Sequence, residues 1–85
     1  MKWTIHIVKQ AGKTLWRIPQ KDRGYILHAL QEMERDPFGG DVEWLKDQPA
    51  TFRRRVGNWR ILFDAAAKNR VIIILDIKRR VSKTY

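Results

Sequence analysis

The chain has 85 residues and a formal net charge of +9, with a pI near 10.5. This length suffices for one small domain with one hydrophobic core, and we treat residues 1–85 as that domain. The absence of cysteine excludes disulfides, thiolate catalysis and cysteine-ligated zinc, and a content of 44% hydrophobic residues argues against a disordered chain.

The N-terminal stretch predicts a strand. Between residues 3 and 8, apolar and polar side chains alternate with the period of two that is typical of a β-strand. Ile5 and Ile7 then face the core, and His6 faces away from it.

Two helices are predicted next. The first covers residues 10–18 and ends before Pro19, because the residue before a proline avoids the helical region. The second covers residues 20–35, where apolar residues recur at spacings of three and four: Ile26, Leu27, Leu30 and Met33. Helices joined this closely form an antiparallel helical hairpin.

A loop separates the helices from the remaining strands. Proline and paired glycines mark residues 36–41 as this loop. We expect Trp44 and Leu45 to lie under the sheet, before Pro49 begins the next extended segment.

Residues 52–63 predict a β-hairpin. Apolar residues alternate with arginines on both sides of Gly57-Asn58, a pair typical of two-residue turns. The turn fixes the pairing: Val56 with Trp59, Arg55 with Arg60, Arg54 with Ile61, Arg53 with Leu62 and Phe52 with Phe63. Arg53, Arg55 and Arg60 then share one face of the sheet. Like charges opposite each other destabilise a sheet, so this face indicates either an anionic partner or a solvated surface.

The last strand completes the predicted sheet. Residues 71–75 are apolar on both faces, as in a central strand, whereas the arginine-rich strand at 51–56 suits an exposed edge. The order of elements predicts an α+β fold with an N-terminal strand, a helical hairpin and then a three-stranded antiparallel meander. Both helices pack on one face of a four-stranded sheet, and the arginines lie on the free face.

Positive charge is concentrated in the C-terminal part of the chain. Residues 1–50 contain eight basic and seven acidic side chains, a net charge of +1. Residues 51–85 contain ten basic and two acidic side chains, a net charge of +8. This directed basic face suits the phosphate backbone of a nucleic acid, and an acidic protein partner fits the same distribution.

Two segments resemble the RelE/ParE superfamily of type II toxin–antitoxin toxins. Residues 52–63 (FRRRVGNWRILF) resemble the family's Y-R-x-R-x-G-x-Y-R-x-x-Y hairpin, and residues 75–85 (LDIKRRVSKTY) resemble its final strand, arginine and terminal tyrosine. The helical hairpin ahead of a glycine-containing linker also fits, so the resemblance covers almost the whole chain and implies a RelE-like fold. It is closer to RelE-like members, which cleave messenger RNA in the ribosomal A site, than to ParE-like members, which inhibit DNA gyrase.

The resemblance implies a set of site residues and a reaction. Arg53 and Arg55 would bind RNA phosphates, Arg60 would stabilise the transition state, and Arg79 would lie near the leaving oxygen. Tyr85 would stack on a base or orient the attacking hydroxyl. The implied enzyme is an endoribonuclease, an mRNA interferase, that uses no metal and no cofactor, because the 2′-hydroxyl of the RNA attacks the adjacent phosphate.

The identity of the general base stays open. The best-known RelE-like sites carry lysines at the positions of Arg53 and Arg55, and arginine does not deprotonate in proteins. Either Tyr85 takes this role, made more acidic by the surrounding arginines, or the ribosome and the RNA supply it.

Other residues have simpler explanations. His6 and His28 lack an evident partner for acid–base catalysis, and Asp64 and Asp76 suit salt bridges to arginines better than a metal site. Arg54 falls on the apolar face, so its stem snorkels past the sheet edge or a bulge turns it outward. All four tryptophans are expected to anchor the core: Trp3, Trp16, Trp44 and Trp59.

Three functions fit these patterns. The first is a toxin that inhibits translation as a ribosome-dependent mRNA endonuclease. The alternatives are a ParE-like gyrase inhibitor without nuclease activity and a non-enzymatic RNA- or ribosome-binding module. A toxin implies a cognate antitoxin, whose acidic or amphipathic segment covers the arginine face or displaces the C-terminal tail. No segment resembles a signal peptide or a membrane span, so we expect a cytoplasmic protein without a membrane partner.

Overall fold

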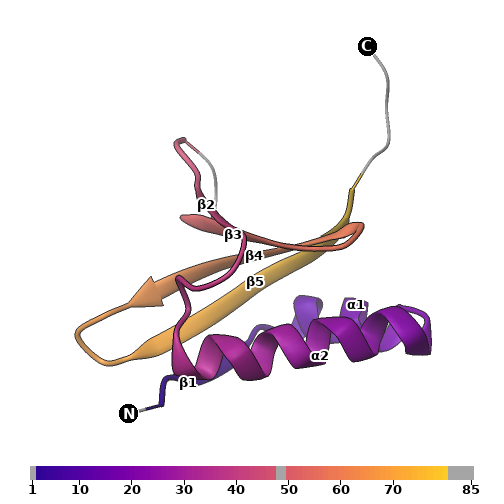
Figure 1. The fold of residues 1–85 in the computed structure, drawn as a ribbon, viewed down its shortest axis with the longest axis horizontal. Coiled ribbons are helices and arrows are strands. Elements are labelled where there is room, and N and C mark those ends of the chain that lie inside the picture. Colours follow the sequence, from indigo (N-terminus) through magenta and orange to yellow (C-terminus); the bar gives the residue numbers. More distant parts are fainter. Residues whose placement is uncertain (1, 48–49, 81–85) are drawn as a thin grey trace.

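The computed structural model describes residues 2–47 and 50–80, which form two helices and five strands. The elements are β1 (Thr4–Ile7), α1 (Lys9–Arg17), α2 (Gln20–Arg35), β2 (Val42–Trp44), β3 (Phe52–Val56), β4 (Trp59–Ala66) and β5 (Val71–Arg79). One sheet contains all five strands in the order β1-β5-β4-β3-β2, with β1 parallel to β5 and the other neighbours antiparallel. Both helices lie on one face of the sheet (Figure 1). The predicted α+β fold is therefore confirmed.

The helices and the sheet enclose one hydrophobic core. The predicted bounds of α2 match the structure, and those of α1 differ by one residue at each end. The helices bury Ala11, Leu15, Ile26, Ala29, Leu30 and Met33 against a sheet face that contributes Ile61, Phe63, Ile72, Ile74 and Ile77. Leu27, which the spacing assigned to the apolar side of α2, is 41% exposed, because it lies at the edge of the buried stripe.

The arginine hairpin has the predicted register. Val56 is paired with Trp59, Arg55 with Arg60 and Phe52 with Phe63. Gly57 has a φ of 58°, and a positive φ at the first central residue is the pattern of a type II′ turn. This turn matches the twist of the flanking strands, so Gly57 sets the pairing of every residue along the hairpin.

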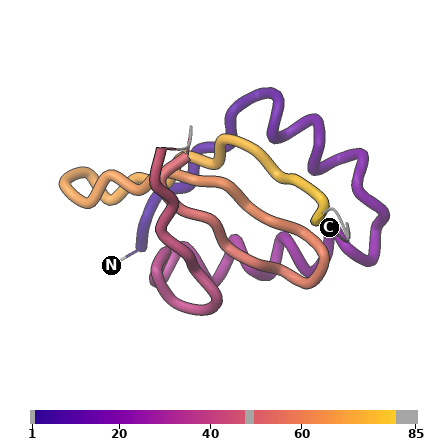
Figure 2. The backbone as a smooth tube through the Cα atoms, turned by 90° about the horizontal axis from the view of Figure 1, so that it is seen from above, coloured from indigo at the N-terminus to yellow at the C-terminus, as the bar shows by residue number. Residues whose placement is uncertain are grey.

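The sheet has five strands where the sequence predicted four. β2 pairs antiparallel with β3, so Glu43 lies opposite Arg53 and Trp44 opposite Phe52. The arginine strand β3 is therefore covered on both sides, and the prediction that it forms the sheet edge was wrong. Figure 2, which looks down on the sheet from above, shows β2 beside β3 at its rim. β5 lies between β1 and β4, as its apolar sequence predicted.

Two of the four tryptophans do not anchor the core. Trp16 is 71% exposed and Trp44 is 66% exposed, so neither fulfils the expectation. The Arg23 guanidinium lies 4.9 Å from the centroid of the Trp16 ring, which gives that ring a cation–π partner at the surface. Trp3 and Trp59 are partly buried against the core, as expected.

Arg54 is buried on the helix side of the sheet. Its Nη2 donates to Glu32 Oε1 of α2 at 2.6 Å, and its Nη1 lies 3.4 Å from the Gly39 carbonyl oxygen. Neither snorkelling past the edge nor a bulge is needed, because α2 supplies a carboxylate above the apolar face. Gly40 has a φ of 80°, and a Cβ there would lie 2.9 Å from Arg54 Cζ. The loop after α2 thus passes directly over the guanidinium, at a residue where only glycine fits.

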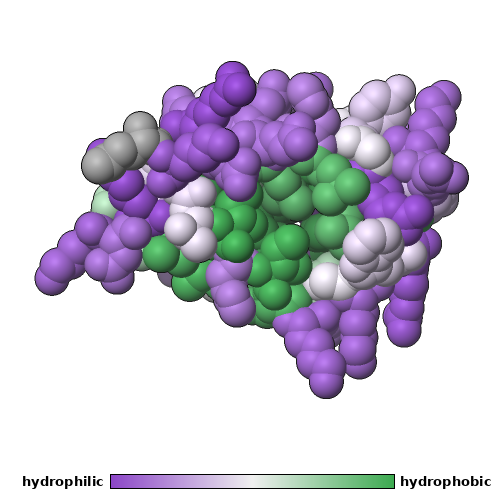
Figure 3. Space-filling view, turned by 90° about the horizontal axis from the view of Figure 1, so that it is seen from below, coloured by the Kyte–Doolittle hydropathy of each residue, from purple (hydrophilic) through white to green (hydrophobic). Residues whose placement is uncertain are grey.

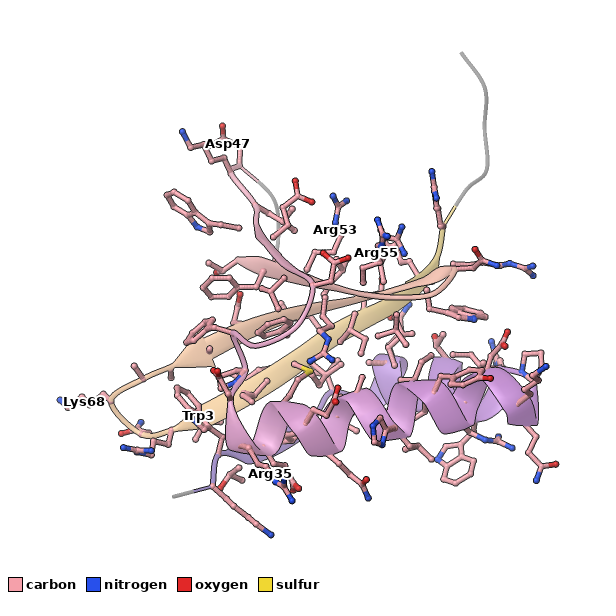
Figure 4. All side chains as sticks on the ribbon, viewed as in Figure 1. Trp3, Arg35, Asp47, Arg53, Arg55 and Lys68 are labelled. Carbon is pink, nitrogen blue, oxygen red and sulfur yellow. The ribbon has the colours of Figure 1, made fainter. Side chains whose placement is uncertain are left out.

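The two faces of the molecule differ in character. Figure 3, which shows the helix side, has apolar surface at its centre and hydrophilic side chains around it. The other face of the sheet carries the arginines, and Figure 4 shows Arg53 and Arg55 projecting from β3 away from the helices. In residues 2–47 and 50–80, no helix has the length and apolar character needed to cross a membrane.

Candidate functional site

A row of cations crosses the open face of the sheet. Arg55 of β3 lies opposite Arg60 of β4, and Arg60 lies opposite Lys78 of β5. Residues directly opposite each other share a face and stand close together, so three positive side chains are adjacent across three strands. Like charges in this arrangement repel, and an anion bound between them would relieve the repulsion.

The row borders a groove with a volume of about 700 Å³. Its apolar floor includes Leu62 and Leu75, and one carboxylate, Asp76, reaches it. Six cationic side chains line the groove: Arg53, Arg55, Arg60, Lys78, Arg79 and Arg80. An open and strongly basic depression of this kind suits a polyanion better than a small neutral ligand.

Arg60 is held in place by the hairpin that carries it. Its Nη1 donates to the Gly57 carbonyl oxygen at 2.9 Å and to the Trp59 carbonyl oxygen at 2.8 Å. These bonds engage only one of the three nitrogens of the guanidinium, which leaves Nη2 and Nε for a ligand. Burial lowers the pKa of Arg60 below its usual value, and the nearby positive charges of Arg55, Arg80 and Arg53 lower it further, whereas Asp41 raises it.

Arg53 and Arg55 each hold a carboxylate. Arg53 pairs with Glu43, and Arg55 Nε lies 3.0 Å from Asp41 Oδ2. Arg60, Lys78, Arg79 and Arg80 form no ion pair with any carboxylate in the described residues. The cations of the groove therefore fall into a paired set next to β2 and an unpaired set on β4 and β5.

The structure brings four of the five predicted site residues to one groove. Arg53, Arg55, Arg60 and Arg79 all line it, and Tyr85 lies outside the described residues. Arg79 is the last residue of β5, whereas the sequence placed it after the strand. It lies opposite Trp59, so it is not in the row with Arg60.

Lys78 and Arg80 also line the groove, and the sequence interpretation missed both. Side chains alternate between the two faces of a strand, so an unbroken β5 would place Lys78 on the same face as the buried Ile72 and Ile74, toward the helices. A bulge in the β4–β5 pairing between Leu62 and Phe63 reverses this alternation, so Ile77 is buried and Lys78 is exposed on the open face. The run of basic residues after position 77 could have identified both residues as candidates. The bulge that turns Lys78 to the open face could not be inferred from the sequence.

The remaining candidates lie elsewhere or have other partners. His6 is exposed on β1, and His28 lies 3.6 Å from Glu32 on the outer side of α2. Asp64 accepts a bond from the Thr51 backbone N–H at 2.7 Å, and Asp76 accepts one from the Ile77 N–H at 2.8 Å. Neither forms an ion pair with an arginine of the described residues, so the predicted salt bridges were wrong. Within the described part of the chain, no group of three or more acidic, histidine or cysteine residues could hold a metal ion.

Known proteins share this architecture. No family model matches the chain. Putative toxin RelE1 of Methanocaldococcus jannaschii is 26% identical over 83 residues, which cover 94% of this chain and 92% of that protein. The RelE–RelB complex of Pyrococcus horikoshii OT3 has a TM-score of 0.85 and 27% identity, covering 98% of this chain and 100% of that one. The RelBE2 toxin–antitoxin complex of Mycobacterium tuberculosis has a TM-score of 0.82 at 21% identity, covering 94% and 100%.

Two helices on one face of a mixed five-stranded sheet, with a basic groove on the other face, define a fold of the RelE class. In sequence and in fold, the chain is similar to proteins of the RelE-like toxin superfamily. This similarity supports a toxin of the type II toxin–antitoxin class.

Proposed function

We propose that the protein is the toxin of a type II toxin–antitoxin system and that it cleaves messenger RNA on the ribosome. The observation that supports this proposal best is the row Arg55–Arg60–Lys78 that borders a basic groove. Stability does not require three adjacent like charges, whereas the phosphates of a single-stranded RNA would use them. The similarity to RelE proteins supports the same assignment.

The proposed reaction is an attack of the RNA on itself. The 2′-hydroxyl loses its proton and bonds to the adjacent phosphorus, the bond from phosphorus to the 5′-oxygen breaks, and that oxygen takes up a proton. The products are a 2′,3′-cyclic phosphate and a 5′-hydroxyl. Charge accumulates on the phosphoryl oxygens on the way, and fixed donors aimed at those oxygens lower the barrier.

Each of the five predicted site residues has a proposed role in this reaction. Arg60 donates from Nη2 and Nε to the phosphoryl oxygens, because the hairpin carbonyls hold Nη1. Arg53 and Arg55 bind the flanking phosphates, and Arg79, which also lines the groove, stabilises the leaving oxygen. Tyr85 stacks on a base or orients the 2′-hydroxyl.

Lys78 is our candidate for proton transfer. It is the only lysine among the described residues that line the groove, and it lies directly opposite Arg60. An ammonium group can exchange a proton with the RNA, and a guanidinium cannot. We expect Lys78→Arg to bind RNA like the wild type but to cleave it about 10²-fold more slowly or worse. Single-turnover cleavage and RNA binding are measured together for each variant.

Lys68→Arg is the matched control for that substitution. Lys68 lies at the tip of the β4–β5 turn, far from Arg53 and Arg55 (Figure 4). The Lys68→Arg substitution should change neither RNA binding nor RNA cleavage. A Lys78→Arg protein that cleaves at the rate of the wild type would show that Lys78 supplies charge alone.

A cognate antitoxin is the proposed protein partner. The structural relatives include toxins solved with their antitoxins, RelE with RelB and the RelBE2 complex. An acidic segment of the antitoxin would compete with RNA for the unpaired cations of the groove.

Primer extension on messenger RNA in programmed ribosomes tests the cleavage proposal, with the same RNA free in solution as a control. We expect cuts in the A-site codon that depend on the ribosome. Intact RNA under both conditions would refute the proposal, and a DNA supercoiling assay with gyrase would then test the ParE-like alternative.

A further inference from the structure

The carboxylates that hold Arg53 and Arg55 are placed by strand pairing. Glu43 of β2 is directly opposite Arg53. The Arg55 backbone N–H donates to the Asp41 carbonyl oxygen at 2.9 Å, so Asp41 extends the same pairing by one residue beyond Val42. Side chains two residues apart share a face, and the two carboxylates therefore stand beside the two arginines on the open face of the sheet.

These ion pairs are exposed and weak. The side chains of Arg53 and Glu43 are 40% and 60% exposed, and those of Arg55 and Asp41 are 60% and 61% exposed. Pairs this accessible to water contribute about 0–1 kcal/mol each. A phosphate that reaches the arginines can therefore displace the carboxylates at little cost.

The paired arginines lie next to cations that have no such partner. Asp41, Glu43, Arg53, Arg55 and Arg60 surround a small hollow of about 120 Å³ that adjoins the main groove. An anion that approaches Arg60 and Lys78 meets charges without a carboxylate partner in the described residues. An anion that approaches Arg53 or Arg55 must first compete with β2.

From this arrangement, and building on the proposed function, we infer that Asp41 and Glu43 are specificity-determining residues. In the free protein, Asp41 and Glu43 form ion pairs with Arg55 and Arg53. Only a polyanion displaces them from these arginines. A strand of RNA bound at Arg60 and Lys78 presents its next phosphates to Arg53 and Arg55 at a high effective concentration, and it displaces both carboxylates. A mononucleotide lacks this advantage and is disfavoured at the β2 side of the groove.

The salt dependence of RNA binding tests this inference. In the wild type, each carboxylate that a phosphate displaces becomes a free anion and takes up a cation from solution. This uptake offsets part of the counterion release from the RNA, so the wild type should show a shallow salt dependence. Asp41→Asn/Glu43→Gln frees both arginines. The slope of log affinity against log salt should steepen by up to about 0.7 for each carboxylate that is no longer displaced, or up to about 1.4 in total. Affinity at low salt should rise about tenfold, and a mononucleotide should gain binding as well.

The probe is a fluorescent 2′-O-methyl oligonucleotide, which cannot undergo attack by its own 2′-hydroxyl, so binding is measured without cleavage. Asp47→Asn/Glu34→Gln is the control, because it removes the same two charges from residues that have no ion pair in the described part of the chain. It should leave the slope unchanged. The single variants Asp41→Asn and Glu43→Gln should each give about half the change, which separates the loss of an ion pair from the loss of β2.

Equal slopes for the wild type and Asp41→Asn/Glu43→Gln would overturn the inference. If the wild type also cleaves messenger RNA on ribosomes, that result leaves the proposed function in place and removes only the role of Asp41 and Glu43. If the wild type neither binds the oligonucleotide nor cleaves, the inference and the proposed function both fall.

Discussion

Arg60→Ala is expected to lower the rate of messenger RNA cleavage on programmed ribosomes by about 10³-fold, within the range found when fixed donors to a developing oxyanion are removed. The side chain is fixed by two bonds to hairpin carbonyls and stands between Arg55 and Lys78 in the cation row. Its free donors are thus oriented before the RNA arrives. Single-turnover primer extension measures the rate, and sedimentation with ribosomes measures binding.

Two further variants make the test specific. Arg60→Lys keeps the charge but loses the planar fork, so it should recover only part of the lost rate. Arg35→Ala removes a cation from the end of α2, on the helix side of the molecule (Figure 4), and should cleave normally. If Arg60→Ala cleaves within a few-fold of the wild type while ribosome binding persists, Arg60 does not stabilise the transition state. If ribosome binding is lost along with cleavage, Arg60 serves recognition.

The hairpin could be predicted because its own residues determine both its register and the face on which each side chain lies. A two-residue turn at Gly57-Asn58 fixes the register, and the alternation on both sides fixes the faces. The bounds of α2 were equally accessible, since Pro19 precedes it and apolar residues repeat along it. Both predictions rest on neighbours in the sequence, where turn geometry and periodicity act directly.

β2 could not be predicted, because its three residues are too few to show a period of two. It is a strand only because β3 lies beside it. The ion pairs of Asp41 and Glu43 with the arginines therefore could not be predicted before the pairing of β2 with β3 was known. Residue type misled in the same way at Trp16, whose size predicted burial, although its position on α1 leaves it exposed.

The sequence predicted the arginines of the candidate site on β3 and β4 but missed Lys78 on β5. Arg53, Arg55 and Arg60 follow from the hairpin alternation alone. Lys78 depends on the bulge in the β4–β5 pairing, which reverses the faces of β5 and cannot be inferred from a run of apolar residues. For Arg54, the alternation predicted the correct face of the sheet. Its partner could not be predicted, because Glu32 lies 22 residues away in the chain.

Glu32→Ala is expected to lower the free energy of unfolding by about 2 kcal/mol, a large share of the stability of a domain of this size. The Arg54 side chain is only 10% exposed, and its Nε is buried without a partner in the described residues. Loss of Glu32 would leave a buried guanidinium with one long contact, to the Gly39 carbonyl oxygen at 3.4 Å. Because Glu32 itself is 52% exposed, the expected effect is smaller than the ~3–5 kcal/mol typical of a fully buried pair.

Urea denaturation of a double-mutant cycle measures this effect. Arg54→Met replaces the guanidinium with an apolar side chain and should change stability by less than about 1 kcal/mol, since apolar replacements of buried charges are often neutral. In that background Glu32→Ala should cost almost nothing, because no buried charge remains to be orphaned. Glu34→Ala, the same substitution two residues along α2 at a residue with no described ion pair, is the control. A Glu32→Ala cost no larger than that of Glu34→Ala would mean that solvent or the loop already satisfies Arg54, and that the ion pair contributes nothing to holding α2 against β3.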